Sequence, residues 1–313
     1  MRYKKFGSTG LNISALTIGT YGVGNAAWGE TSKDAYMKAI RKMVELGANH
    51  IDTAINYGGG ESERTLGKII GEFRDKVYVT SKGCFALRDG KIVRDASREN
   101  MLRSCDISLE RLGLDYLDMY LVHQPDPNTP IAETMDALNT LKKQGKVRFI
   151  GVSNYDLDML KEACRYAEIS AIQVQYSMVS RANQALMEWA AAHGIGIMTH
   201  GSLGAGILTG AFRICPNFPE TDVRSYVYDY FKEPKFSRIM KLIDVMDQIS
   251  VNHDSCPLAQ IAVNWQIQKD FVSTALVGVR SEQEAIENCG GMDWTLTTDE
   301  MKMIDNVIVA NGI

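Results

Sequence analysis

The sequence of 313 residues predicts an α/β fold in which eight parallel strands close into a (β/α)8 barrel. Three observations lead to this fold class. Short β-branched or aromatic runs occur eight times, and several are apolar on both faces, as is usual for parallel strands covered on each side. Helical patterns separate them, and eight is the number at which such a sheet closes. No Pro/Gly/Ser-rich linker interrupts the series, so we expect a single domain over residues 1–313.

The expected strands follow one another in a regular order. An open doubly wound sheet is the alternative, but the first strand-to-helix turn carries no G-x-G-x-x-G phosphate loop. The eight strands are, in chain order, LTIGT, NHIDTA, KVYVTSK, DYLDMYLVH, VRFIGVSN, AIQVQYS, GIGIMTH and STALVGV. Two segments lie outside the repeat. Residues 2–14, with GSTG as a turn, predict an N-terminal β-hairpin on the barrel floor, and residues 213–236 predict a long aromatic-rich loop after the seventh strand.

Helix boundaries are expected where capping residues flank an apolar stripe. The first helix has Thr31 as its N-cap and Gly47 as its C-terminal stop. Another helix is expected to begin with Thr129 as N-cap and Pro130 in the first turn, and to end at Gly145.

Composition limits the partners of the chain. Apolar residues make up 45% and charged residues 23%, which is enough for a sizeable core. The 34 basic and 38 acidic residues give a net charge of −4 without a basic run, which argues against nucleic acid or anionic membranes as main partners. The start MRYKKFGSTG precedes no apolar stretch long enough for a signal peptide or a membrane span.

The cysteines lie far apart, with neither a C-x-x-C motif nor zinc spacing. Most fall inside helix-like or strand-like stretches, where cysteine is usually a small apolar filler. We therefore expect a reduced, cytoplasmic protein. The six residues are Cys84, Cys105, Cys164, Cys215, Cys256 and Cys289.

In a barrel of this kind, chemistry occurs where strands end and the following loops begin. Each candidate alone has a structural explanation, such as a helix cap or a solvated rim residue. Titratable groups of complementary type at one barrel mouth favour a functional site. The side chains delivered at the strand ends are Asp52, Tyr57, Ser81, Lys82, His123, Gln124, Ser153, Asn154, Gln173, Tyr176, Ser177 and His200.

Four of these groups predict a particular chemistry. A tyrosine with a pKa near 10 carries its proton at neutral pH. An ammonium such as Lys82 lowers the pKa of Tyr57, and Asp52 keeps that ammonium charged and oriented. Such a set can protonate an alkoxide that develops from a carbonyl, while His123 can hold the carbonyl oxygen or relay the proton. No acyl-transfer triad with an elbow motif appears, and a metal site would need more carboxylates and histidines.

The stretch HIDTAINYGGGESERTLG is a poor phosphate loop, because Glu61 and Glu63 would repel an anion. Ser62 and Glu63 instead predict a helix start, where negative charge suits the dipole. We expect the phosphate site after the seventh and eighth strands. There, GSLGAGILTG and VGVRSEQEAIEN offer backbone amides, small residues and Arg280 near a helix start.

Several motifs occur together: FGSTGLNIS, IDTAINYG with SERTLG, VTSKG, YLVHQPD, IGVSNY, QVQYS, GILTG and VGVRS followed by IEN. With them the sequence resembles the aldo-keto reductase family over nearly its whole length. The resemblance implies a (β/α)8 barrel that binds NADP(H), or in some members NAD(H), and reduces aldehydes and ketones without a metal. The partner would be a small carbonyl compound or its alcohol.

The resemblance also implies roles for individual residues. Tyr57 would be the general acid, Lys82 would lower its pKa, Asp52 would pair with Lys82, and His123 would orient the carbonyl. The substrate pocket would include Tyr21, Trp28, Tyr57 and His123. The cofactor-binding residues would be Ser153, Asn154 and Gln173 at the nicotinamide, His200, Gly201, Ser202, Leu203, Gly204, Gly206 and Leu208 along the nicotinamide and pyrophosphate, and Gly278, Arg280, Ser281, Glu284, Glu287 and Asn288 around the adenosine.

Two departures from the family pattern bear on the cofactor. The residue that stacks on the nicotinamide is commonly an aromatic followed by Ser-Pro-Leu, whereas this chain has His200-Gly201-Ser202-Leu203. An imidazole offers less stacking area than a phenol ring. Glu284 stands where family members have Arg or Gln. Its carboxylate would oppose a 2′-phosphate, unless it accepts a ribose hydroxyl or pairs with Arg280 and lies aside. These departures reduce the expected preference for NADP(H) over NAD(H) to a small margin.

The sequence leads to an NADP(H)-dependent oxidoreductase that acts on a carbonyl, with a sugar or polyol derivative as a candidate substrate. The loop FPETDVRSYVYDYF is similar to that of bacterial members tied to sugar or inositol pathways. The alternative is a barrel that binds the cofactor as a sensor or regulatory subunit. The protein is expected to be a monomer or small homo-oligomer. Aromatic residues of the 213–236 loop are expected either to wall the pocket or to anchor the loop.

Overall fold

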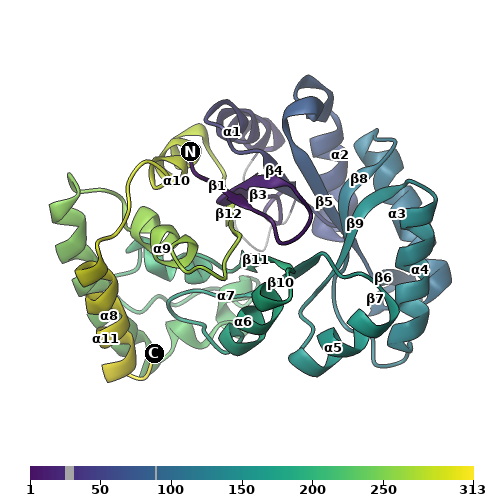
Figure 1. Ribbon diagram of the computed structural model, residues 1–313. Helices are drawn as coiled ribbons and strands as arrows, with labels where there is room; N and C mark the ends of the chain where they lie inside the picture. The colour runs from purple at the N-terminus through teal and green to yellow at the C-terminus, as the bar shows by residue number, and fades with distance from the viewer. Residues whose placement is uncertain (25–31, 89) are drawn as a thin grey trace.

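The computed structural model describes residues 1–24, 32–88 and 90–313. Its centre is a closed barrel of eight strands in the order β10-β11-β12-β3-β4-β5-β8-β9, and every neighbouring pair is parallel. Helices surround this ring (Figure 1). The predicted (β/α)8 barrel is confirmed, and the open sheet is excluded.

All eight predicted strands are present. Their successive residues are buried almost throughout, because one face lines the barrel interior and the other lies under the helices. The strands are β3 (Leu16–Gly19), β4 (His50–Asp52), β5 (Tyr78–Gly83), β8 (Leu117–Val122), β9 (Val147–Ser153), β10 (Ala171–Gln175), β11 (Gly196–His200) and β12 (Thr274–Gly278).

Each barrel strand is followed by a helix that covers the outer face. Two further helices, α8 (Lys235–Asn252) and α11 (Thr298–Ala310), were not predicted; they pack against each other at one side of the ring (Figure 1). The covering helices are α1 (Lys33–Glu45), α2 (Glu61–Gly67), α3 (Arg98–Leu112), α4 (Ile131–Lys143), α5 (Leu157–Tyr166), α6 (Gln184–Ala192), α9 (Leu258–Ile267) and α10 (Glu282–Gly290).

The helix caps differ in part from the prediction. Ser32 is the N-cap of α1, where its Oγ accepts a hydrogen bond from the backbone N–H of Ala35 at 3.1 Å. The predicted cap, Thr31, lies outside the described residues. The predicted start of α4 is wrong, because Pro130 is the N-cap and Thr129 Oγ1 instead donates to Asp126 Oδ2 at 2.7 Å. The predicted end is confirmed, since the C-cap Gln144 is followed by Gly145 with a φ of 74°. The Asp126 carboxylate, three residues before Thr129 in the loop after β8, is a strong acceptor for this hydroxyl.

The predicted N-terminal hairpin is formed by β1 (Tyr3–Lys5) and β2 (Asn12–Ser14), which pair antiparallel. Phe6 and Ile13 are fully buried and belong to the cluster that fills the barrel interior. The Phe6 ring lies directly against Gly196, where a Cβ would overlap it. Since Gly196 begins β11, the hairpin closes the end of the barrel at which the strands start, opposite the predicted site.

A second hairpin, β6 (Phe85–Arg88) with β7 (Lys91–Arg94), follows β5 and was not predicted. Residues 213–236 contain two short helical turns, α7 (Val223–Tyr226) and η6 (Asp229–Phe231). In this segment Phe218 and Phe231 pack edge to face at 4.9 Å between ring centroids. The Arg224 guanidinium lies 4.3 Å from the Phe218 centroid. Phe218, Phe231 and Arg224 therefore anchor the segment through contacts with one another.

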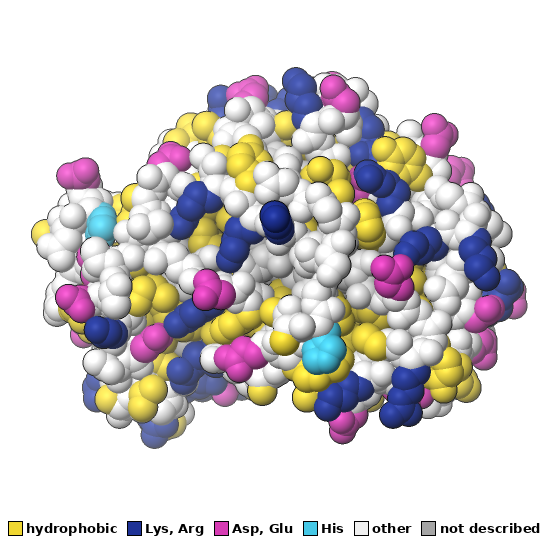
Figure 2. Space-filling view, in the orientation of Figure 1, with side chains coloured by type: hydrophobic (Ala, Val, Ile, Leu, Met, Phe, Trp, Pro, Cys, Tyr) yellow, Lys and Arg dark blue, Asp and Glu magenta, His cyan; other side chains and the backbone are white. Residues whose placement is uncertain are grey.

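The surface carries charges of both signs. On the face seen in Figure 2, basic and acidic side chains are interspersed among apolar ones, so no field of a single sign covers this face. None of the helices in the described ranges combines the length and the apolar character needed to span a bilayer.

Candidate active site

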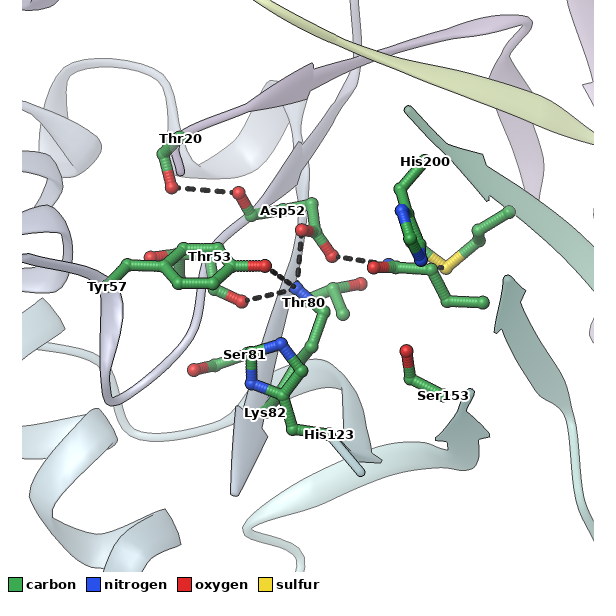
Figure 3. Close-up of polar contacts among 12 residues, drawn as sticks. Thr20, Asp52, Thr53, Tyr57, Thr80, Ser81, Lys82, His123, Ser153 and His200 are labelled. Atoms are coloured by element: carbon green, nitrogen blue, oxygen red, sulfur yellow. Dashed lines mark hydrogen bonds and ion pairs between the residues drawn. The ribbon is translucent and has the colours of Figure 1, made fainter. Parts of the chain in front are cut away.

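Three of the predicted residues meet at the carboxyl ends of β4 and β5. Lys82 Nζ lies 2.6 Å from Asp52 Oδ1 and 3.0 Å from Tyr57 Oη. It also donates to the carbonyl oxygen of Thr53 at 3.0 Å. Figure 3 shows the Lys82 ammonium between the Asp52 carboxylate and the Tyr57 hydroxyl. All three donors of the ammonium therefore have partners.

Burial makes this arrangement rigid. The Lys82 and Asp52 side chains are 0% and 2% exposed, and the second Asp52 oxygen accepts from Gln173 Nε2 at 2.8 Å. A buried ion pair of this kind needs all its remaining hydrogen-bonding positions filled to persist. Gln173, predicted to hold the nicotinamide, thus also orients the carboxylate.

The turn that carries Tyr57 depends on three glycines. The 3-10 turn η2 (Tyr57–Gly60) has φ of 56° at Gly58, 64° at Gly59 and 92° at Gly60. Only glycine adopts three such left-handed conformations in a row at low cost. A Cβ at Gly58 would also lie 2.7 Å from the carbonyl oxygen of Val23. The glycines therefore shape the turn that directs Tyr57 toward Lys82.

The electrostatics differ in one respect from the prediction. Burial raises the pKa of the Tyr57 phenol, and the nearby Lys82 ammonium lowers it by less, so the net pKa is above the ordinary value. Burial lowers the pKa of Lys82, but Asp52 and Tyr57 outweigh it, and the net pKa is raised. The expected net lowering at Tyr57 is therefore wrong, because burial exceeds the effect of the ammonium. The pair keeps Lys82 protonated and Tyr57 able to donate a proton.

His123, at the end of β8, faces the Tyr57 ring edge to face at 5.4 Å between centroids. Burial, reinforced by Lys82 and His200, lowers the pKa of His123 well below its usual value, so the imidazole is neutral. Within the described residues, no group is placed to hydrogen-bond its buried Nδ1. A neutral ring that carries its proton on Nε2 places a lone pair, and not an N–H group, at this buried position.

The residues predicted to bind the nicotinamide lie side by side and are connected by hydrogen bonds. Ser153 and Gln173 are register partners on β9 and β10. Asn154 Nδ2 donates to Ser153 Oγ at 3.0 Å and to the carbonyl oxygen of His123 at 3.1 Å, and His200 Nε2 lies 3.2 Å from Asn154 Oδ1. Burial lowers the pKa of His200 to about 4, so this ring is also neutral. Figure 3 shows Ser153 and His200 beside the Asp52–Lys82 pair.

The predicted pyrophosphate loop follows β11. Its turn η5 (Gly204–Thr209) has positive φ at Gly204 (55°), Ala205 (56°) and Gly206 (95°). The backbone N–H groups of Gly204 and Gly206 donate to the carbonyl oxygens of Gly201 and Leu203, and that of Leu208 also donates to Leu203. Ser202 Oγ donates to the carbonyl oxygen of Thr199 at 3.4 Å. The loop is thus a preformed small-residue turn whose contact with a pyrophosphate stays a prediction.

The predicted adenosine site lies at the start of α10, after Gly278 ends β12. Ser281 is the N-cap, and its Oγ accepts from the backbone N–H of Glu284 at 3.2 Å. The Glu284 carboxylate binds Arg280 three times, from the backbone N–H at 2.8 Å, Nη2 at 2.7 Å and Nε at 3.1 Å. Arg280 is therefore paired with the very residue that was expected to oppose a phosphate.

Two further members of this predicted site follow on α10. Asn288 is 5% exposed, and Glu287 Oε1 accepts from Gln283 Nε2 at 2.9 Å. Their contact with an adenine stays a prediction.

Aromatic side chains contact both Tyr57 and His123. The Tyr21 ring lies edge to face on Tyr57 at 5.0 Å between centroids, as expected of a pocket residue. Trp28 lies outside the described residues. Phe85 contacts His123 edge to face at 5.3 Å. Sequence reasoning missed Phe85; its place three residues after Lys82 was the available signal. Tyr228, from the 213–236 segment, lies near Tyr21. Burial, reinforced by Tyr21 and Tyr230, raises the pKa of Tyr228 to about 12.

Several strand-end residues do not join the site. Tyr176 is fully buried and stacks on Trp265 at 5.5 Å between centroids, which is a packing role. Ser177 pairs with Ser180 in an isolated bridge. Gln124 contributes its backbone N–H, which donates to Cys84 Sγ at 3.2 Å.

The site holds no cluster of metal ligands. Across the ranges that the structure describes, no three His, Cys, Asp or Glu side chains are grouped to bind a metal ion.

Comparison with known proteins adds a relationship by descent. The family model described as "Aldo/keto reductase family" matches residues 15–309. The aldo-keto reductase YhdN of Bacillus subtilis is 31% identical, over 100% of this chain and 95% of that protein. The NADH-specific methylglyoxal reductase of Escherichia coli is 30% identical, over 95% of each chain.

A solved structure agrees with this relationship. The glycerol dehydrogenase AKR11B4 of Gluconobacter oxydans superimposes with a TM-score of 0.90 at 26% identity, and the match covers 99% of this chain and 95% of that one.

Proposed function

Because this chain belongs to the aldo/keto reductase family, we propose that it interconverts a carbonyl compound and its alcohol with a nicotinamide cofactor, and that Tyr57 is the general acid and base. The observation that carries the proposal is the buried Asp52–Lys82–Tyr57 set, with contacts of 2.6 and 3.0 Å at the barrel mouth. A proton donor must lie within hydrogen-bond reach of the reacting oxygen, and the mouth is the open end of this barrel.

The proposed chemistry uses each member of the set in turn. During reduction, Tyr57 donates its proton to the carbonyl oxygen, and Lys82 stabilises the negative charge left on the phenolate. Asp52 keeps Lys82 charged, and neutral His123 donates a hydrogen bond that holds the carbonyl oxygen. The reduced nicotinamide, when bound, supplies the hydride. In oxidation the phenolate of Tyr57 takes up the alcohol proton.

The side chains beside Tyr57 fit a nicotinamide. Ser153, Asn154 and Gln173 bring amide and hydroxyl groups to one side of the acid, which suits a carboxamide. The neutral His200 ring provides a flat surface next to Asn154.

We propose NADP(H) as the preferred cofactor, with NAD(H) as the competitor. The Arg280–Glu284 pair is partly exposed, with side chains at 57% and 32%, and such pairs are worth about 0–1 kcal/mol. A charge-assisted hydrogen bond to a phosphate is worth about 1.5–3 kcal/mol. A 2′-phosphate should therefore displace Glu284 from Arg280. One relative is named as NADH-specific, which makes this competition the point to test.

The surroundings of the acid favour a small uncharged carbonyl compound, with sugar and polyol derivatives as the first candidates. The Tyr21 ring contacts Tyr57, and the Phe85 ring contacts His123. Aromatic walls of this kind pack against the C–H faces of such molecules. The names of two relatives, a methylglyoxal reductase and a glycerol dehydrogenase, are in line with small substrates.

A substrate screen in both directions tests the proposal. The panel contains aldehydes, ketones, sugars and polyols, each assayed with NADPH and NADH or with the oxidised forms. We expect turnover of at least one small uncharged carbonyl that depends on Tyr57. Tight binding of cofactor with no turnover of any carbonyl would instead indicate a sensor or regulatory subunit.

A further inference from the structure

Glu63 is a fully buried carboxylate that the proposed chemistry does not use. It lies on α2, outside the strand ring, and its side chain is 0% exposed. One oxygen accepts from Ser81 Oγ at 2.7 Å, and the other lies 3.1 Å from Arg111 Nη1. Ser81 precedes Lys82 on β5, and neighbouring residues of a strand point to opposite faces. In Figure 3 the Ser81 hydroxyl points away from the Lys82 ammonium.

Arg111, near the end of α3, connects this carboxylate to the turn that carries Tyr57. The same Nη1 donates to the carbonyl oxygen of Ile55 at 2.9 Å, two residues before Tyr57. The N–H of Ile55 donates to the carbonyl oxygen of Lys82 at 3.2 Å. The guanidinium also lies directly against Gly60, where a Cβ would overlap it. Arg111 therefore contacts the turn both before and after Tyr57.

A group of hydroxyls fixes the start of α2 to the same strand ends. Ser62 Oγ donates to Thr20 Oγ1 at 2.7 Å and lies 2.8 Å from Thr53 Oγ1. Thr20 and Thr53 follow β3 and β4 directly. Because Ser62 and Glu63 are consecutive, these hydrogen bonds of Ser62 also fix the position of Glu63 relative to the strand ends.

We infer that Arg111 and Glu63 are positioning residues that hold the Tyr57 hydroxyl within hydrogen-bond reach of Lys82. Arg111 supports the turn, and Glu63 orients the guanidinium and offsets its charge. The three glycines leave this turn without side-chain packing of its own, so an outside support is needed. A misplacement of about 1 Å costs up to about 10²-fold in rate. The inference rests on the proposed role of Tyr57 as the acid.

The test variant is the double substitution Arg111→Met with Glu63→Gln, which removes both charges and leaves neither buried alone. We expect kcat to fall about ten- to a hundredfold, by the scale just given, while the Kd for NADPH stays within about twofold. The kinetic pKa of the acid should rise, because the Lys82 ammonium no longer lowers the pKa of a displaced Tyr57. An unchanged kcat would overturn the inference.

A matched control lies at the other end of β5. Arg74 Nη1 donates to the carbonyl oxygen of Val77 at 2.8 Å, and its Nη2 lies 2.9 Å from Asp118 Oδ2. The Arg74 and Asp118 side chains are 20% and 1% exposed, against 23% and 0% for Arg111 and Glu63. Arg74→Met should lower the Tm but leave kcat and the pH profile unchanged. If both variants lower kcat alike with unshifted pH profiles, the role of Arg111 and Glu63 is only structural.

A readout without turnover separates this inference from the proposed function. With 13Cζ-labelled tyrosine, the Tyr57 resonance is assigned by its loss in Tyr57→Phe. It should shift or broaden in the double variant and stay unchanged in Arg74→Met. This result would support the positioning role even if no carbonyl were turned over, which would count against the proposed function alone. An unmoved Tyr57 resonance in the double variant would overturn the positioning role.

Discussion

Lys82 is the residue through which the candidate acid is connected to the barrel. Burial alone would favour its neutral form, yet Asp52 at 2.6 Å and Tyr57 at 3.0 Å raise its net pKa. The ammonium therefore stays charged next to a phenol whose own pKa burial raises. The cost of burying the ion pair is met by filling every hydrogen-bonding position around it, including the one that Gln173 fills.

This arrangement predicts a large effect of removing the phenol oxygen. Tyr57→Phe should lower kcat/KM by about 10²–10⁴-fold, the usual contribution of one positioned acid. The affinity for the cofactor should hardly change, because the hydroxyl contacts Lys82 rather than the predicted cofactor loops. Steady-state kinetics and fluorescence titration measure the two quantities. Retained activity would remove Tyr57 from the mechanism.

Lys82→Met tests the same set from the other side. The ammonium lowers the pKa of Tyr57 against the effect of burial. Its loss should therefore lower activity and move the kinetic pKa of the acid upward. A pH profile that does not shift would mean that Lys82 serves only the structure.

Among the elements, the start of α10 is where we expect the choice between NADP(H) and NAD(H) to be made. A helix N-terminus favours anions, and Arg280 stands immediately before it. Glu284, one turn on, occupies Arg280 with its carboxylate and is itself held by the Ser281 cap through its backbone N–H. In the proposed NADP(H) complex, Arg280 would bind the 2′-phosphate and Glu284 would compete with it for the guanidinium.

The two substitutions should act in opposite directions. Arg280→Ala should weaken NADPH binding about ten- to a hundredfold at low salt, because about 1.5–3 kcal/mol of binding free energy is lost. The affinity for NADH should hardly change. Glu284→Gln should tighten NADPH binding, because Arg280 no longer has a charged partner. Titration of both cofactors with each variant measures this. If the wild type binds NADH better and Glu284→Gln weakens it, the carboxylate binds the ribose and NAD(H) is the cofactor.

At the scale of the whole molecule, the barrel interior contains a buried histidine that is not part of the site. His50 Nδ1 lies 2.8 Å from Thr17 Oγ1, and His50 Nε2 lies 2.7 Å from Thr80 Oγ1. Burial lowers the pKa of His50 from 6.5 to about 3. The unfolded chain therefore binds a proton between about pH 6.5 and 3 that the folded chain does not. Stability from this group is complete above pH 6.5 and is lost as the pH falls.

This linkage predicts acid sensitivity of the fold. From pH 6.5 to pH 5 the His50 term alone amounts to about 2 kcal/mol, at 1.36 kcal/mol per pH unit. Urea unfolding at pH 7 and pH 5 should show the wild type less stable at pH 5, and His200 contributes in the same direction. His50→Gln keeps a donor and an acceptor and should reduce the difference. An equal difference in both proteins would contradict the assignment.

Sequence patterns alone were sufficient to predict the barrel and to bring the proposed catalytic residues to one end of it. Strands covered on both faces appear as short apolar runs, and their number and spacing predict closure into a ring. Since the carboxyl ends of parallel strands meet at one face, Asp52, Lys82 and His123 could be placed at a common mouth before any contact was known. Tyr57 was added to this set because it lies only five residues after Asp52, in the loop that follows the same strand.

The partner of each polar side chain became known only from the packing of the folded chain. Periodicity records which face of an element is buried, but it does not record the neighbour that lies there. The predicted cap Thr129 bonds to Asp126 instead, and Arg111 reaches the carbonyl oxygen of Ile55 across 56 residues of sequence. The sign of the pKa shift at Tyr57 likewise required the burial of its hydroxyl, which no local pattern encodes. Contacts of this kind arise from packing between helices and strands that are distant in the chain.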